Sequence, residues 1–296
     1  ELTKVWQIGL KHRQQAHSLG IFKWDDSKFK PDIVGINGEK RAKTIQDIIY
    51  INKDSTSDII LPEVIKNDIS GWKNKPKLEF FVDFETVTDV NDDFSNFPYR
   101  TGNSLIFMIG CGYEKLDGNW EMEVFTSDNL SIEEEIKISD KWIRYMRNVT
   151  DEVLGKASDL PNVYHWTHAE KTFWNKSLAN RTEISKSESR KLPVIPWSDF
   201  CEVARATPLV VRGAFGFGLK SIAKKLKEHG LTETDWTDGP GDGLGAMVGG
   251  WYCDKKYKET GEPMYSFDYM KGIESYNRVD CKVMWELINY LRENHC

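Results

Sequence analysis

The segment 78–87, Leu-Glu-Phe-Phe-Val-Asp-Phe-Glu-Thr-Val, constrains the fold of this chain more than any other. Its β-branched and aromatic residues predict a strand. Asp83 and Glu85 stand at i, i+2 spacing, so both carboxylates point to the same face of that strand. Two adjacent carboxylates in an apolar strand repel each other and lose hydration, which is costly unless something compensates. A divalent cation is the simplest compensation, although a solvated strand end would also explain the pair.

The segments around this strand predict an α/β fold with a mixed sheet flanked by helices. Two further strands follow the first, and the short loop between them predicts an antiparallel meander. Ser131 begins a helix, and its spacing to Glu134 matches a capping box. The predicted strands are 78–87, 105–113, 120–126, 162–166 and a short one from Val194. Three main helices are predicted to begin near residues 131, 169 and 219, and a long last helix is predicted over 270–294.

Residues 1–77 predict a small helical region that is separate from the α/β domain at 78–296. Gly20 and the segment 34–38 form two glycine-containing turns between helical stretches. This pattern indicates a helix-hairpin-helix-like unit, which offers backbone N–H groups to phosphates. A plain helical docking domain explains the same pattern equally well. The segment Asn74-Lys-Pro-Lys77 predicts the linker.

The charge of the chain excludes a histone-like polycation. There are 40 Lys and Arg against 46 Asp and Glu among 296 residues, a net charge of −6. Residues 1–77 carry 14 basic and 10 acidic side chains, which leaves a net of −10 for the remainder. An acidic region usually repels nucleic acid. The alternative is that some of these carboxylates gather to bind cations.

The cysteines and the hydropathy pattern indicate in which cellular environment we expect the protein. Five cysteines without a Cys-x-x-Cys pair argue against a disulfide framework and a zinc knuckle, and predict buried, reduced thiols in an intracellular protein. The chain has no stretch of about 18 uncharged apolar residues, so no membrane span is predicted. The first residue is Glu1 rather than Met, so we expect the chain to be a piece of a longer multidomain protein.

Two further motifs carry acidic residues. In Tyr276-Asn-Arg-Val-Asp280, the i, i+4 spacing puts Tyr276 and Asp280 on one helix face, which Val283 and Leu287 continue inward. A buried Asp280 needs a partner, and a buried Arg or Lys would also serve. In Tyr164-His-Trp-Thr-His-Ala-Glu170, a strand runs into a helix. Thr167-x-x-Glu170 also fits a capping box, which would give Glu170 a structural role.

Together these motifs resemble the DEDD-type 3′–5′ exonucleases of the ribonuclease H-like superfamily, in their tyrosine variant. Asp83-Phe-Glu85 matches the Asp-x-Glu of the family's first strand, and Tyr276-x₃-Asp280 matches its last helix. Within this family, the sequence motifs are most similar to those of YprB-type domains of predicted RecB-family nucleases. Glu170 occupies the position of the second acid, where most DEDD enzymes have Asp, and Asp199 is the alternative.

The resemblance implies a metal-dependent nuclease with a two-metal mechanism that acts on DNA or, alternatively, RNA. Two Mg²⁺ or Mn²⁺ ions would be bound by Asp83, Glu85, Glu170 and Asp280, with Asp83 bridging both ions. The ligands are all oxygen atoms, which favours such hard cations. Tyr276 would orient the attacking water.

Substrate contacts are predicted from charge and aromaticity. Lys220 and Lys224 share a helix face and could meet phosphates, although a solvated face explains most lysine runs. Trp166 could stack on a base, although most tryptophans belong to the core.

Two rival functions remain open. One is a noncatalytic ribonuclease H-like interaction module of a larger nucleic-acid-processing protein. The other is an endonuclease or transposase of the same fold, which the tyrosine-containing last helix disfavours.

Overall fold

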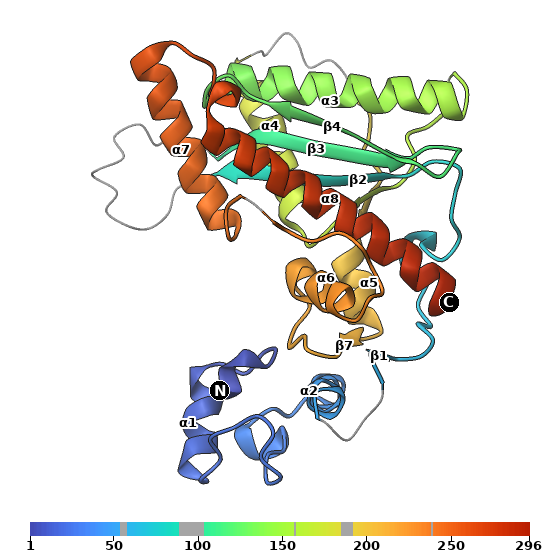
Figure 1. Cartoon of the computed structure of the whole chain (residues 1–296), viewed down its shortest axis with the longest axis vertical. Helices are drawn as coiled ribbons and strands as arrows, with labels where there is room; N and C mark the ends of the chain where they lie inside the picture. The colour runs from blue at the N-terminus through green and yellow to red at the C-terminus, as the bar shows by residue number, and fades with distance from the viewer. Residues whose placement is uncertain (54–57, 89–103, 157, 185–191, 238) are drawn as a thin grey trace. The chain divides into compact units, whose positions relative to one another are not determined.

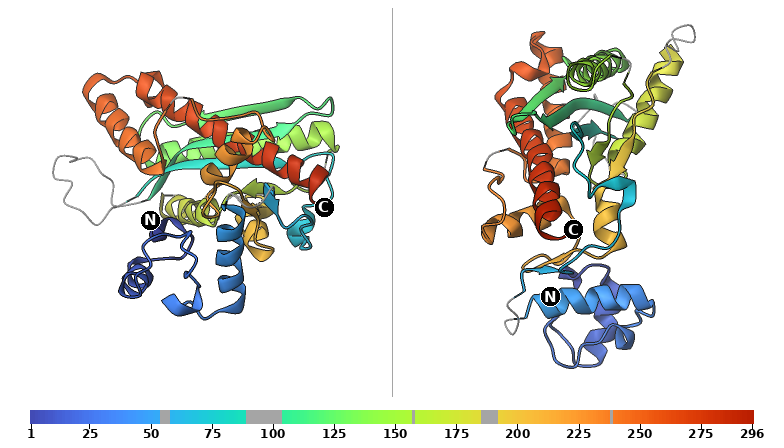
Figure 2. Two further views of the ribbon diagram at one scale, coloured as in Figure 1. Left: turned by 60° about the horizontal axis from the view of Figure 1, so that its bottom comes forward. Right: turned by 90° about the vertical axis from the view of Figure 1, so that its right-hand side faces the viewer.

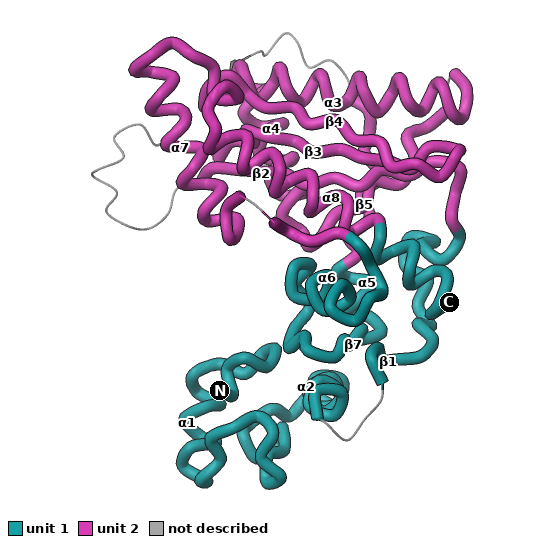
Figure 3. The backbone as a smooth tube through the Cα atoms, in the orientation of Figure 1, with its two compact units in different colours: residues 1–74, 201–233, 286–296 teal, residues 75–200, 234–285 magenta. Residues whose placement is uncertain are grey.

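The structure, a computed structural model, describes residues 1–53, 58–88, 104–156, 158–184, 192–237 and 239–296 (Figure 1). The chain forms two compact units, which Figure 3 distinguishes by colour. Unit 1 comprises residues 1–74, 201–233 and 286–296, and unit 2 comprises residues 75–200 and 234–285.

Unit 2 is built on a five-stranded mixed sheet. Its strands are β2 (Phe80–Val87), β3 (Leu105–Glu114), β4 (Trp120–Thr126), β5 (Val163–His165) and β6 (Trp197–Asp199), in the order β4-β3-β2-β5-β6. The pairs β2–β3 and β3–β4 are antiparallel, which confirms the predicted meander, whereas β2–β5 and β5–β6 are parallel. The strand that carries the two carboxylates is therefore the central one.

Helices cover both faces of this sheet (Figures 1 and 2). The helices α3 (Ile132–Val153) and α4 (Ala169–Ile184) share one core with Val82 and Phe84 of β2. There the ring of Phe84 meets that of Trp142 edge-on, with 5.4 Å between the centroids. A second core joins Phe107 of β3 to α7 (Gly243–Thr260) and to the first part of α8 (Asp268–Asn294). Because side chains alternate along β2, Asp83 and Glu85 point toward the second group of helices.

The structure defines the starts of two predicted elements, the helix at Ser131 and the fifth strand. Ser131 accepts a hydrogen bond from the amide of Glu134 at 3.3 Å, as a capping box requires. The Glu134 carboxylate, however, accepts from the amide of Asp128 at 3.0 Å. The fifth strand begins at Trp197 rather than Val194, directly after Pro196, which has no N–H to donate to a ladder.

Unit 1 is mainly helical. It contains α1 (Leu10–Ser18), α2 (Glu39–Ile51), α6 (Leu219–Glu228), most of α5 (Phe200–Ala206), the short turns η1 (Leu2–Lys4), η2 (Asp32–Val34) and η3 (Ile69–Gly71), and the end of α8. The strands β1 (Ile60–Leu61) and β7 (Val210–Val211) pair antiparallel. Gly20 and Gly35 have φ angles of 74° and 84°, so glycine is favoured at both predicted turns. The helix-hairpin-helix likeness stays a prediction.

The division into compact units differs from the predicted domains at 1–77 and 78–296. The first segment of unit 1 ends at Asn74, close to the predicted linker, but residues 201–233 and 286–296 join it. The reason is packing, because Val210 and Phe215 lie in one buried cluster with helix α2. In addition, the Arg292 side chain donates to the carbonyl of Trp72 at 2.6 Å. The domain boundary itself stays a prediction.

The prediction of buried thiols holds for four of the five cysteines. Cys111, Cys201, Cys253 and Cys281 are buried, whereas Cys296 is exposed. Within the described ranges, no helix combines the length and the apolar character that crossing a membrane requires.

Candidate metal centre

Three carboxylates converge in unit 2. Asp83 and Glu85 come from the central strand β2, and Asp280 comes from helix α8. One oxygen of each lies within 4.8 Å of the others. Glu85 and Asp280 are buried, whereas Asp83 keeps some exposed surface, so that solvent can reach the cluster. The structure thus brings together three of the four predicted metal ligands.

A neutral side chain connects α8 to β2 at this point. The amide group of Asn277 donates to the backbone carbonyl of Asp83 at 3.1 Å and to its carboxylate at 2.8 Å. Asn277 is fully buried, and it fits because Gly110 lies opposite Asp83 on β3. A Cβ atom at residue 110 would lie 2.0 Å from Asn277 Oδ1. The absence of a side chain at Gly110 therefore allows this contact.

The electrostatics of the cluster are unfavourable in the absence of a cation. Burial, and next the charge of Asp280, raise the pKa of Glu85 to about 8. The same two causes raise the pKa of Asp83 well above its ordinary range. The charges that act on these two groups all belong to carboxylates. Glu85 Oε1 is buried and finds no hydrogen-bond partner within the described ranges. These properties are those of a site that a divalent cation would stabilise.

Glu170 lies beside the cluster at the start of α4. Its carboxylate raises the pKa of both Asp83 and Glu85, although it is not one of the three groups within 4.8 Å. Glu170 Oε2 lies 3.1 Å from His165 Nδ1 on β5, and both residues are buried. Burial raises the pKa of Glu170, and its hydrogen bond to His165 opposes this shift. His165 therefore fixes the direction of this carboxylate.

Asp199, the alternative second acid, serves the turn before α4. One of its carboxylate oxygens accepts from the amide of Thr167 at 2.9 Å. Thr167 has a φ of 74°, which is uncommon for a residue other than glycine. Asp199 thus holds the unusual turn that leads from His165 to Glu170.

Tyr276 is buried one helical turn before Asp280. Burial raises the pKa of its hydroxyl, and the carboxylates of Asp280, Asp83 and Glu85 raise it further. Tyr276 is therefore protonated at neutral pH, and its hydroxyl lies among the charges of the cluster.

The predicted substrate contacts fall in both units. Lys220 and Lys224 lie on α6 in unit 1, where Lys224 is exposed and Lys220 is half-buried. Trp166 belongs to unit 2 and is only 8% exposed, with its ring 6.1 Å from that of Phe200. Little of its surface is open to a base, so the structure does not support the stacking prediction for Trp166.

Three residues of the site carried no role in the sequence-based prediction: Gly110, His165 and Asn277. Their signal in the sequence is weak, because a glycine within a strand and a neutral side chain near an acid are common in proteins without any functional site. Comparison of the chain with protein-family models and with curated proteins finds no match in either set. Function must therefore be argued from the site itself.

The raised pKa values predict how stability depends on pH. The pKa of Glu85 is higher in the folded protein than its ordinary 4.5, so the folded state binds the proton more tightly. This stabilisation is present below about pH 4.5 and is lost as the pH rises through about 8. We expect the free energy of unfolding, measured by urea titration in EDTA, to fall between pH 5 and 8. The slope is at most about 1.4 kcal/mol per pH unit per carboxyl group.

Glu85→Gln should reduce this slope, whereas substitution of the exposed Glu262 by Gln should leave it unchanged. Equal slopes in the wild type and Glu85→Gln would show that Glu85 is not a carboxyl group with a raised pKa.

The close approach of Asn277 to β3 predicts a local cost for any side chain at residue 110. Gly110→Ala should lower the free energy of unfolding by about 1–3 kcal/mol, because the new methyl group displaces Asn277. Gly243→Ala is the control, since nothing lies within 4 Å of the place that its new methyl group would take. In the double variant with Asn277→Ala, the cost of Gly110→Ala should shrink. Full additivity of the two changes would contradict this assignment.

Proposed function

We propose that the protein is a metal-dependent nuclease that hydrolyses phosphodiester bonds of DNA or RNA, as a 3′–5′ exonuclease of the DEDD type. The observation that carries the proposal is the convergence of Asp83, Glu85 and Asp280 from separate elements. Glu170 lies beside them, and Tyr276 precedes Asp280 by one helical turn. A mixed sheet with the acid-bearing strand at its centre supports a ribonuclease H-like fold.

The residues present fit divalent cations. All donors are carboxylate oxygens, which suit Mg²⁺ and Mn²⁺. The buried, unpartnered Oε1 of Glu85 is a free ligand atom within the described ranges. Asp83, Glu85 and Asp280 would hold one ion, and Asp83 with Glu170 would hold a second. Bound divalent ions supply charge neutralisation at the phosphate and a lower pKa for bound water.

The protein's own groups have defined roles around these ions. Asn277 fixes the Asp83 carboxylate through a 2.8 Å hydrogen bond, and His165 fixes that of Glu170. Tyr276 keeps its proton, because burial and the neighbouring carboxylates raise its pKa. Its hydroxyl can therefore orient a water molecule for attack on the phosphate without contributing another negative charge.

The proposal predicts loss of hydrolysis when one ligand is neutralised. Single- and double-stranded DNA and RNA, labelled at the 3′ or the 5′ end, are incubated with Mg²⁺, Mn²⁺ or EDTA. The wild type should release nucleotides from the 3′ end with either metal and none in EDTA. Asp280→Asn should lower the rate by more than the ~100-fold that losing an outer-shell partner can cost.

Asp268→Asn is the matched control. It makes the same change on the same helix, but the Asp268 side chain is 98% exposed and pairs with Lys271. Its activity should equal that of the wild type. Full activity of Asp280→Asn would contradict the proposal, and cleavage of a circular strand would indicate an endonuclease. Absence of hydrolysis on every substrate would instead favour a noncatalytic interaction module.

A further inference from the structure

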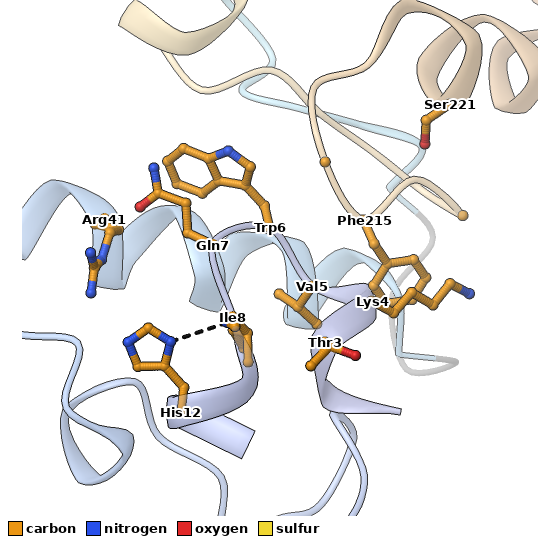
Figure 4. A pocket seen from close by; sticks show the side chains of 13 residues that line it. Thr3, Lys4, Val5, Trp6, Gln7, Ile8, His12, Arg41, Phe215 and Ser221 are labelled. Atoms are coloured by element: carbon orange, nitrogen blue, oxygen red, sulfur yellow. Dashed lines mark hydrogen bonds between the residues drawn. The ribbon is translucent and has the colours of Figure 1, made fainter. Parts of the chain in front are cut away.

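Unit 1 contains an open cavity of about 860 Å³ (Figure 4). Its wall is formed by the N-terminal segment 3–9, the start of α1, helix α2 and the segment 213–221. A cavity of this size accommodates a nucleotide unit rather than only a small ion. None of the described residues that line it is acidic. Three of their side chains are basic, namely Lys4, His12 and Arg41.

Arg41 of α2 is the first donor of this cavity. Its Nε atom is buried and has no hydrogen-bond partner within the described part of the chain. Figure 4 shows its guanidinium directed toward His12 of α1. Lys43, two residues further along α2, differs, because its ammonium pairs with Asp47 at 2.6 Å. A guanidinium with an unpartnered N–H in a cavity free of acidic lining is suited to an anion.

His12 adds a donor beside Arg41, whereas the Lys4 side chain points away from both along another part of the wall (Figure 4). The amide of Gly9 donates to His12 Nδ1 at 3.1 Å, which leaves Nε2 as the ring nitrogen that can donate to a ligand. The Lys4 ammonium lies 4.0 Å from the centroid of the Phe215 ring, which positions it without neutralising it. The ionisable side chains among the described lining residues are therefore all basic.

The start of α6 forms another part of the wall, away from Arg41 and His12 (Figure 4). Ser221 in its first turn lines the cavity, and the N-cap residue Gly218 has no side chain to bond the first amides. The N-terminus of a ten-residue helix favours negative charge nearby. Trp6, half-buried with its ring edge-on to Phe217 at 5.1 Å, adds aromatic surface. Donors for a phosphate thus lie close to a surface on which a base can stack.

The charge of each unit supports a polyanionic ligand for unit 1. Unit 1 carries 19 Lys and Arg against 15 Asp and Glu, a net of +4, whereas unit 2 carries 21 against 31, a net of −10. The unit that holds the carboxylate cluster is therefore anionic by itself. Attraction of a nucleic-acid strand has to come from the cationic unit.

We propose that the cavity of unit 1 binds a backbone phosphate of a nucleic-acid strand through Arg41 and His12. This inference rests on the proposed function for the class of ligand. It concerns binding alone, so it can be tested without hydrolysis.

The test measures binding of fluorescently labelled 20-nucleotide DNA and RNA strands to the full chain by anisotropy in EDTA. Arg41→Ala should weaken binding about tenfold, the size of one charge-assisted hydrogen bond. The slope of log K against log salt should also fall in magnitude by about 0.7, the value for one single-strand phosphate contact. Lys43→Ala, which removes one charge from the same helix, should change neither quantity.

Two further arms separate the outcomes. Asp280→Asn should bind the strand with the same dependence on Arg41, so failure of the nuclease proposal and failure of this inference are distinguishable. Adenosine monophosphate should compete only weakly, because it offers a single phosphate. Equal affinity of Arg41→Ala and the wild type would overturn the inference. Equally, it would be overturned if adenosine monophosphate bound the cavity without displacing the strand.

Discussion

Mutual repulsion among Asp83, Glu85 and Asp280 is the constraint on which the rest of unit 2 depends. Their oxygens lie within 4.8 Å of one another in a region that has lost most of its water, which raises the pKa of Asp83 and Glu85. The surrounding structure holds the Asp83 carboxylate with the neutral Asn277 amide, and the neighbouring Glu170 carboxylate with the His165 imidazole. The Asn277 amide fixes the position of Asp83 without neutralising its charge, as the proposed cation site would require.

The two units differ in net charge. The carboxylate cluster is one part of the negative charge of unit 2, which carries a net of −10. The proposed nucleic-acid substrate would need attraction from elsewhere, and we propose that the cationic lining around Arg41 in unit 1 provides it. Under these two proposals, unit 2 would supply the carboxylates for hydrolysis, and unit 1 would bind the phosphate backbone.

The sequence predicted the strands of the sheet and the inward face of the last helix, because period-2 and period-3.6 patterns are local signals. It did not predict that residues 201–233 belong with the N-terminal region, since that depends on Val210 and Phe215 packing against distant helices. Gly110 and Asn277 were missed for a similar reason. Their contact joins β3 to α8 across 167 residues, and no local pattern records it.

The central claim is that the three converging carboxylates form a divalent-cation site. Isothermal titration of the metal-free protein with Mn²⁺ at pH 7, repeated in buffers of different ionisation enthalpy, tests it most directly. The account predicts saturable binding that releases protons, because carboxyl groups with raised pKa values must lose them to coordinate the ion. It also predicts that Asp83→Asn abolishes this binding. Failure of the wild type to bind Mn²⁺, or unchanged binding by Asp83→Asn, would contradict it.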